Sequence, residues 1–435
     1  MKFVTMIPML VAASACAIQP TPYSPPDIAI SGALLAQAAG PEGVVDIAHP
    51  LSAYDLASIA ILSNPDLKVV RAQEGLAGAQ LFAAGLLPDP TLGLGADFPI
   101  NGVNTVIALT SSLGLDLAAL STRPARVDAA KANAASVRQD VLWTEWLTRQ
   151  NAKLLATRIS WLEGIKLKTT SYRQIADQDL DRAIAAAARG DIAAIEVDAR
   201  RLAAADASDR DRSAENQLAA ARLDLNRLLG IAPDEIIRLQ APSATEAGMP
   251  AAESLFKTAL DARADLQGLR EGLAAANAGR AVADASRFPL PGISLNAGRD
   301  TGNLRTLGPA VSFTLPVWNR ARSDQAVAQT NLQVLEAQYQ ARAETVRADI
   351  GAALTAVSIA RRQRADVVQD LAGISDQAAR AEIAARRGDV SETSAAATRL
   401  TALDKEILAD SLALAAAESA IALETAIGRP MEIFE

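Results

Sequence analysis

The chain has few of the residues that build catalytic and metal sites. Its 435 residues contain one cysteine, Cys16, and one histidine, His49. One cysteine allows neither an intrachain disulfide nor a cysteine-based metal cluster. His49, next to Pro50, is interpreted as a solvated linker residue, so it offers no partner to a serine or cysteine nucleophile. We therefore expect no enzyme, no cofactor and no bound metal ion.

The chain also lacks a net positive charge, and aromatic residues are scarce. The net charge is −8 and aromatic residues make up 3% of the chain. A nucleic-acid-binding protein is expected to carry a basic face, so no nucleic-acid partner is expected. Few large side chains suit thin, close contacts between helices, and alanine, which is abundant here, has the highest helix propensity. The composition therefore predicts a mainly α-helical protein with long helices.

A long apolar run is lacking after the N-terminal segment. A membrane-spanning helix needs about 20 apolar residues, so any insertion into a membrane would have to use strands. Residues 1–15, with Lys2 before a short apolar region, predict a signal peptide. The sequence "AASAC" resembles a bacterial lipobox and predicts acylation of Cys16; the alternative is an incidental cysteine. Residues 16–50 are rich in proline, alanine and glycine and predict an extended arm.

An internal duplication organises the rest of the chain. Five landmarks recur at separations of 198 to 201 residues, which predicts two large structural halves. We place the first repeat at 51–230, a linker at 231–263 and the second repeat at 264–435. The paired landmarks are Asp66 and Asp265, Pro88 and Pro289, Ser112 and Ser312, Arg189 and Arg387, and Gly230 and Gly428.

The sequence of each half predicts the same order of elements: a helix, two strands with alternating apolar and polar residues, a very long helix, a glycine break and another helix. Asn64 can cap the first helix and Pro65 suits its first turn. Pro88, Pro90, Pro289 and Pro291 mark the helix-to-strand transitions, because proline lacks an N–H and disfavours helix in the residue before it. The predicted helices are 66–86, 126–189, 191–229, 264–288, 322–387 and 389–427; the predicted strands lie at about 91–117, 292–299 and 308–317.

Predicted lengths favour a rod. At 1.5 Å per residue, the long helix of each half spans roughly 100 Å, about the sum of the two shorter ones. Each half can therefore pair one continuous helix with two helices stacked end to end. Coiled-coil spacing supports this packing, and Arg342 interrupts the apolar row. The spaced residues are Leu332, Leu335, Tyr339, Val346, Ile350, Ala353 and Val357.

The strand count predicts oligomerisation. Four strands cannot close a barrel, and unpaired strand edges are not tolerated in lipid. Three copies would supply twelve strands, enough for a barrel with an aqueous lumen, although the count alone does not fix the number three. The expected architecture is a transmembrane β-barrel above a tube of helical rods.

This layout, with "LPDPTLGLG" before the first strands and "SFTLPVWNRARSDQAVAQ" after the last, resembles the TolC-like outer-membrane efflux factor family. The resemblance covers about residues 50–430. It implies a homotrimer with a β-barrel in the outer membrane and an α-helical tunnel in the periplasm. It further implies a passive exit duct engaged by a periplasmic adaptor and an inner-membrane pump. The proline-rich arm after Cys16 resembles that of lipoprotein members serving resistance-nodulation-division pumps.

The resemblance also implies roles for particular residues. The hairpin turns that would face the adaptor correspond to Arg189-Gly190-Asp191-Ile192 and Arg387-Gly388-Asp389-Val390; the alternative is an ordinary helix break with charged caps. Members often carry an acid six residues past the turn glycine, at the closed tunnel end. Glu196 matches that position and Ser394 departs from it, with Asp198, Asp389 and Glu392 as weaker candidates. A ring of such carboxylates would favour cations; the alternative is solvated surface acids.

Two other functions remain open at this point. A duct for a type I polypeptide secretion system would share the same layout. A lipid-anchored periplasmic coiled-coil scaffold would share the helices but has no need of alternating strands. The cargo is not encoded in any recognisable motif, because an open duct passes what its pump delivers.

Overall fold

The computed structural model describes residues 39–40, 43–44 and 49–431, except for 104, 242–247, 249, 288, 289, 316 and 320. The predicted signal peptide, the predicted acylation at Cys16 and the predicted transition at Pro289 lie outside the described residues.

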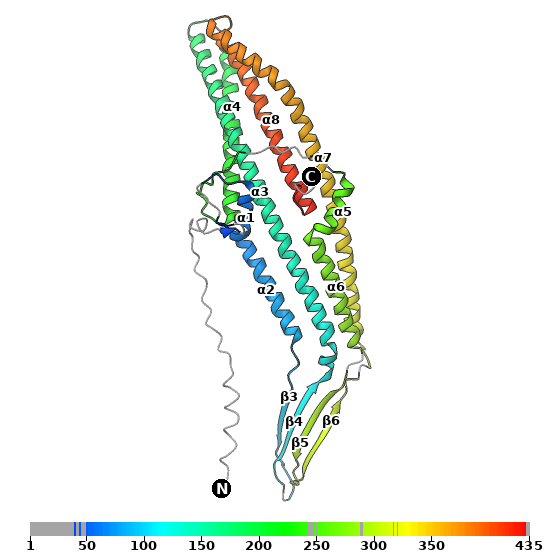
Figure 1. Cartoon of the computed structure of the whole chain (residues 1–435). Coiled ribbons are helices and arrows are strands. Elements are labelled where there is room, and N and C mark those ends of the chain that lie inside the picture. The colour runs from blue at the N-terminus through cyan, green and yellow to red at the C-terminus, as the bar shows by residue number, and fades with distance from the viewer. Residues whose placement is uncertain are drawn as a thin grey trace.

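The described chain forms a long rod with helices along most of its length and a sheet at one end (Figure 1). Two helical turns lie at the opposite end, α3 to α4 and α7 to α8. Strands β1 (Ala39–Gly40) and β2 (Gly43–Val44) form a separate small hairpin. The helices are α1 (Ala53–Ser63), α2 (Pro65–Gly85), α3 (Leu117–Ala188), α4 (Ala194–Leu229), α5 (Ala252–Ala262), α6 (Ala264–Ala285), α7 (Arg322–Arg387) and α8 (Glu392–Ile427); the sheet strands are β3 (Thr91–Asp97), β4 (Ala108–Asp116), β5 (Gly292–Arg299) and β6 (Arg305–Ser312).

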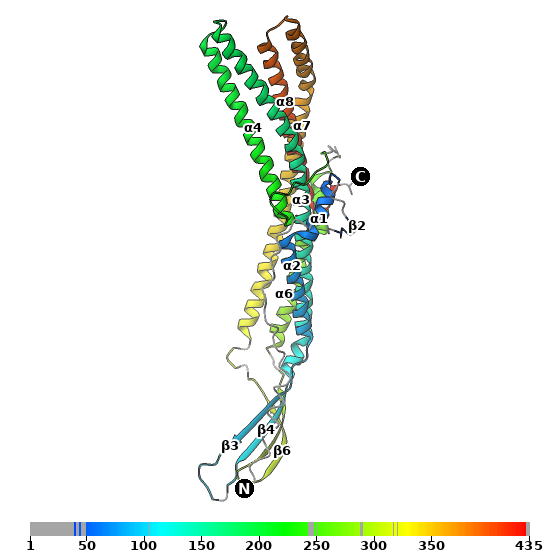
Figure 2. The same cartoon turned by 90° about the vertical axis from the view of Figure 1, so that its left-hand side faces the viewer.

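The predicted duplicated architecture is confirmed. In the first half α3 packs against α2 and α4, and in the second α7 packs against α6 and α8 (Figure 2). The two halves join because α3 also packs against α6 and α8. Asn64 caps α2 as predicted, since its side chain accepts a hydrogen bond from the Leu67 N–H at 2.9 Å.

Three predicted helix starts differ from the structure. The long helix α3 begins at Leu117 and not at residue 126, with Pro124 inside it. Side chains satisfy carbonyls of this first stretch: Thr122 donates to Ala118 O and Arg126 donates to Ala119 O. Helices α4 and α8 begin three residues later than predicted, because the chain bends after each turn glycine and an extended residue, Ala193 or Ser391, then precedes the helix.

The last strand is also displaced from its predicted position. β6 spans 305–312 and not 308–317, because a tight turn follows β5 at once. Asp300 N donates to Leu304 O at 3.0 Å, and the Leu304 N–H donates to Asp300 Oδ1 at 2.9 Å. Asn303, with φ of +68°, takes the left-handed position in this turn.

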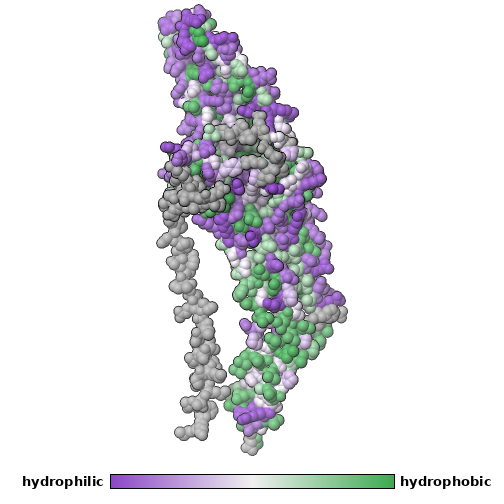
Figure 3. All heavy atoms as spheres, in the orientation of Figure 1, coloured by the Kyte–Doolittle hydropathy of each residue, from purple (hydrophilic) through white to green (hydrophobic). Residues whose placement is uncertain are grey.

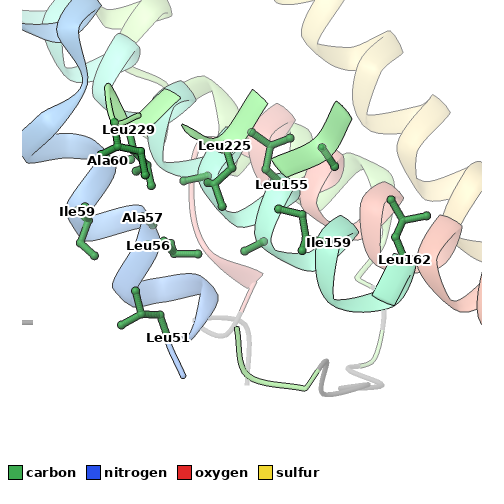
Figure 4. Close-up of a cluster of buried hydrophobic side chains, with 14 of the residues drawn as sticks. Leu51, Leu56, Ala57, Ile59, Ala60, Leu155, Ile159, Leu162, Leu225 and Leu229 are labelled. Atoms are coloured by element: carbon green, nitrogen blue, oxygen red, sulfur yellow. The ribbon is translucent and has the colours of Figure 1, made fainter. Parts of the chain in front are cut away.

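Leucine, isoleucine and alanine side chains form most of the core where the helices stack. Leu155, Ile159 and Leu162 of α3 meet Leu56 of α1 and Leu229 of α4 (Figure 4). Leu255, Leu266, Val346, Ile350 and Ile427 form the corresponding cluster in the second half.

The predicted apolar row of α7 is confirmed in the middle of the helix. Val346, Ile350, Ala353 and Val357 are all buried. Arg342, which interrupts the apolar row, pairs through Nε with Asp265 Oδ2 of α6 at 2.7 Å. None of the described helices carries an apolar stretch long enough to cross a membrane.

Candidate functional site

The sheet has two outer strands that pair on one side only within the chain. Its order is β3-β4-β5-β6, and every neighbouring pair is antiparallel. β3 and β6 are therefore edge strands, whose outward N–H and C=O groups are available to another strand.

One face of the sheet is apolar. Residues directly opposite each other in a sheet share a face, so the register places Leu92, Leu113, Leu295 and Pro309 in one row. No element of the described chain covers this face: Leu94 and Leu307 are 72% and 74% exposed. Figure 3 shows hydrophobic residues gathered at the sheet end of the rod. The apolar face comprises Leu92, Leu94, Ala96, Leu109, Ser111, Leu113, Leu115, Ile293, Leu295, Ala297, Leu307, Pro309 and Val311, with Arg299 and Arg305 at its hairpin end.

The opposite face is made of small and polar residues. Glycines lie across from hydroxyl groups: Gly93 faces Ser112, and Gly292 faces Ser312 in the second half. A methyl group on Gly93 would lie 2.5 Å from Ser112 Oγ, and one on Gly292 would lie 2.6 Å from Ser312 Oγ. The close approach excludes a larger residue at either glycine without movement of the serine. The polar face comprises Thr91, Gly93, Gly95, Asp97, Ala108, Thr110, Ser112, Gly114, Asp116, Gly292, Ser294, Asn296, Gly298, Thr306, Gly308, Ala310 and Ser312.

The proline residues lie at the junction between this sheet and the helices. Pro88 and Pro90 follow the end of α2 at Gly85 and precede β3, which begins at Thr91. Pro291 immediately precedes β5.

The two hairpin turns share one geometry at the other end of the rod. Gly190 and Gly388 have φ of +81° and +79°. The N–H of the following residue, Asp191 or Asp389, donates to the carbonyl of Ala186 or Ala384 five residues earlier, which is the Schellman arrangement. Arg189, Gly190, Asp191, Arg387, Gly388, Asp389 and Val390 are exposed, and Ile192 is half-buried.

The acidic candidates lie just beyond these turns and are exposed. Glu196 is in the first turn of α4, and Glu392 is in the first turn of α8. Asp198 Oδ1 pairs with Arg201 Nη1 at 2.8 Å, and Glu392 Oε2 pairs with Arg182 Nε at 2.9 Å. Ser394 receives the cap of α8, since its N–H donates to Ser391 Oγ. No contact within the described residues joins these side chains into a cluster.

A row of ion pairs between α3 and α8 was not predicted from the sequence. Basic residues of α3 meet acids of α8 along the antiparallel helices. Helical spacing alone does not reveal such pairs, because the partners lie more than 200 residues apart. The pairs are Lys153–Glu424 at 2.7 Å, Arg158–Glu418 at 2.6 Å, Lys168–Asp410 at 2.7 Å and Arg182–Glu392 at 2.9 Å.

A buried charged group at the start of α6 was also missed. Arg263 is 2% exposed, binds both carboxylate oxygens of Asp265, and lies 4.2 Å above the ring of Trp143. Burial raises the pKa of Asp265, but the hydrogen bonds and charges of Arg263 and Arg342 outweigh that effect and hold it below its usual value. Burial and the charge of Asp265 raise the pKa of nearby Asp140.

Comparisons with known proteins find the fold among solved structures. No family model and no curated protein matches the chain. The CmeC outer membrane channel of Campylobacter jejuni superposes with a TM-score of 0.71 and 16% identity over 95% of both chains. The outer membrane protein VceC of Vibrio cholerae gives 0.67 and 18% identity over 87% of this chain and 96% of its own. The chain has the fold of outer-membrane channels. CusC, whose structures describe transmembrane channel formation, shares that fold with a TM-score of 0.69 and 17% identity over 87% of this chain and 92% of its own.

Within this channel fold, the two-faced sheet and the hairpin turns lie at opposite ends of the rod (Figure 1). The arrangement suits a protein that touches different surroundings at its two ends. The sheet offers an apolar face and a polar face, and the turns offer exposed charged residues.

Proposed function

We propose that the chain is the outer-membrane exit channel of a tripartite efflux pump. It passes substrates passively from a periplasmic adaptor and an inner-membrane pump to the exterior. The observation that carries the proposal is the uncovered apolar face of a sheet whose other face is polar. An apolar face without a cover in the chain suits lipid, and a glycine- and hydroxyl-rich face suits a water-filled lumen.

Closure of the wall requires further copies. Open edges within lipid leave backbone groups without hydrogen bonds, at a cost of several kcal/mol each. Three copies of the four-stranded sheet give a twelve-stranded barrel, large enough for an aqueous pore. The homotrimer then continues the helical rods as a tunnel into the periplasm.

The remaining roles are assigned to the ends of the rod. The turns at Gly190 and Gly388 contact the adaptor, supported by their exposed charged residues. Glu196, assisted by Asp198 and Glu392, lines the closed tunnel end and favours cations there. Acylation of Cys16 anchors the N-terminus to outer-membrane lipid.

A purified full-length chain tests the proposal. We expect a trimer in detergent by light scattering and stepwise conductance after insertion into a planar bilayer. The control is the same preparation boiled before reconstitution, which should give no steps. A chain that is monomeric in detergent and forms no conducting pore overturns the proposal and favours the scaffold.

A further inference from the structure

We propose that Arg299 and Arg305 form a binding site for the phosphate headgroup of a membrane lipid, one site in each chain. The inference rests on the proposed outer-membrane channel, which places the apolar face of the sheet in lipid, and it names a lipid class that this face selects. The two arginines lie directly opposite each other on β5 and β6. They belong to the apolar face, at the hairpin end of the strands, which is the end of the rod away from the helices (Figure 1).

Two arginines in this position are unfavourable for the sheet alone. Directly opposite residues have Cβ atoms about 4.5–5.5 Å apart, and like charges so placed destabilise a sheet. Within the described residues, neither arginine forms an ion pair with a carboxylate. Asp97 lies on the polar face, and Asp300 Oδ1 accepts the N–H of Leu304. The site therefore has positive charge that this chain does not neutralise.

The guanidinium of Arg299 is held in place by a single hydrogen bond. Its Nη2 donates to Ile107 O at 3.0 Å, which fixes the group beside the end of β4. Its Nε is buried and has no hydrogen-bond partner in the described chain. Arg305 is exposed, and its side chain makes no hydrogen bond to any described residue. Since a guanidinium carries five N–H donors, the pair keeps donors for an acceptor from outside the chain.

Phosphate is the anion that suits this pair. A guanidinium binds two phosphate oxygens through parallel N–H···O bonds, and such charge-assisted bonds are stronger than neutral ones. Arginine is also more weakly hydrated than lysine, so less hydration is lost when it binds an anion beside apolar residues. With the two side chains side by side, one phosphate can accept hydrogen bonds from both.

Apolar neighbours favour a lipid as the source of that phosphate. Leu109 lies beside Arg299 in the same row of the sheet, and Leu307 follows Arg305 on the same face. Leu307 is 74% exposed. A lipid can cover these leucines with its acyl chains while its phosphate contacts the guanidinium groups. Free phosphate would gain nothing from the leucines, because only the lipid removes apolar surface from water.

The arginines lie at the edge of the apolar face, where headgroups are expected. Ile293, Leu295 and Ala297 occupy the apolar face along β5, and Arg299 takes the last position of that face in the strand. In a transmembrane barrel the outward apolar band is about 25 Å tall, and an arginine is tolerated near its edge far better than at its middle. The long arginine stem can remain on apolar surface while the charge reaches the headgroups.

The duplication shows that a hairpin of this sheet does not require the arginines. The glycine–serine pairs of the polar face relate β3 to β5 by 199 residues and β4 to β6 by 200. The positions equivalent to Arg299 and Arg305 are therefore Ile100 and Thr105, which are uncharged and exposed. The arginine pair is thus a feature of the second hairpin alone, which gives one site per chain.

Quenching of an added tryptophan tests the site in the full-length chain. Leu307→Trp places an indole next to Arg305 on the lipid side, and the chain without this change measures the background of the four native tryptophans. The protein is reconstituted in phosphatidylcholine vesicles that contain a minor fraction of either phosphatidic acid or phosphatidylcholine with brominated acyl chains. Bromine quenches indole on contact. We expect brominated phosphatidic acid to quench the added tryptophan several-fold more effectively than brominated phosphatidylcholine.

Variants of the arginines show whether they cause the preference. In the Leu307→Trp background, Arg299→Gln with Arg305→Gln should make quenching by the two lipids equal. Arg299→Lys with Arg305→Lys should keep only part of the preference, because lysine lacks the bidentate fork. Arg212→Gln with Arg227→Gln removes the same charge from exposed positions of α4 and should leave the preference unchanged. A preference that survives the first double variant overturns the inference.

Two further controls locate the site and separate the lipid from free phosphate. Ile293→Trp lies on the same face at the other end of β5 and should be quenched equally by both lipids. Excess inorganic phosphate, matched in ionic strength by sodium chloride, should not abolish the preference at Leu307→Trp. Its loss in phosphate but not in chloride would assign the site to the free anion and overturn the lipid. An equal preference at Ile293→Trp would show general attraction to the sheet and contradict the site.

Native mass spectrometry provides a measurement without an added tryptophan. The trimer in detergent should retain up to one short-chain phosphatidic acid per chain and several-fold less phosphatidylcholine, and Arg299→Gln with Arg305→Gln should remove the difference. A conducting trimer that retains both lipids equally overturns the inference and leaves the proposed channel intact. A monomer that conducts nothing overturns both proposals.

Discussion

Asn64 and Arg263 hold equivalent helix junctions together in the two halves. Asn64 Nδ2 donates to Leu228 O at 2.8 Å, and Arg263 Nη1 donates to Ala426 O at 2.7 Å. Both side chains are buried, at 4% and 2% exposure. Each satisfies a carbonyl in the last turn of one helix while its own residue precedes the next helix. The junctions stack the two short helices of each half against one long helix.

The junctions should differ in their contribution to stability. Arg263→Ala removes the buried partner of Asp265 and should lower the free energy of unfolding by about 3–5 kcal/mol. Asn64→Ala removes a cap and a neutral hydrogen bond and should cost about 1–2 kcal/mol. Arg263→Lys should rescue only part of the loss, because lysine lacks the bidentate fork. Chemical unfolding followed by circular dichroism measures all three, and equal losses for the two alanine variants would contradict the assignment.

The two faces of the sheet should respond oppositely to the same charge. Leu295 and Asn296 are neighbours in β5 and lie on opposite faces. Leu295→Arg should reduce heat-modifiable trimer in the outer-membrane fraction, since arginine facing lipid costs about 2–4 kcal/mol near the midplane. Asn296→Arg should assemble normally and lower single-channel conductance. Assembly defects of the same size in both variants would show that Leu295 does not face lipid.

Protonation of Asp140 should stabilise the helical rod as the pH is lowered. Burial and the charge of Asp265 raise its pKa, so the ionised form is disfavoured in the folded chain. The penalty is present above the folded pKa and disappears as pH falls below the unfolded value. Asp140→Asn should therefore raise the melting temperature at pH 8, with the difference shrinking toward pH 4. Asp128→Asn, which removes another exposed acid from the same helix, is the control for the loss of one negative charge. A difference at Asp140 that grows toward acid pH would refute this sign.

The turns should act only through the proposed adaptor. Reversing both acids, Asp191→Arg and Asp389→Arg, should abolish efflux in cells while leaving the trimer and its bilayer conductance unchanged. A photo-crosslinker at residue 191 or 389 should capture the adaptor, and one at the exposed Asp224, at the far end of α4, should not. Wild-type efflux in the double variant would contradict the proposal that these turns contact the adaptor.

Much of the fold could be predicted because local patterns decide it. The helix at 322–387 matches α7 at both ends, and the glycines that end α3, α4, α7 and α8 stand out in the sequence. The strand alternation predicted two pairs of strands and their place between helices. The start of α3 could not be predicted, since Pro124 is usually a helix breaker, yet α3 begins at Leu117 and continues through it.

Contacts between segments that are distant in the sequence could not be predicted from local patterns. The pairing of Lys168 with Asp410 and the bond of Arg342 to Asp265 depend on how helices lie side by side. Arg342 looked like a flaw in an apolar row, yet it is half of a partly buried ion pair. The displaced β6 has a similar origin, because its alternation continues beyond its partner strand and gives no signal of where pairing stops.

The glycine–hydroxyl pairs of the polar face have a consequence for transport. Ser112 and Ser312 fill the space that a side chain at Gly93 or Gly292 would need, so the surface is even at these two pairs. In the proposed channel, a molecule moving past these pairs would meet small hydroxyl groups and no large side chain. Contacts at these pairs would be weak for cargoes of very different shape, which favours flux over discrimination there.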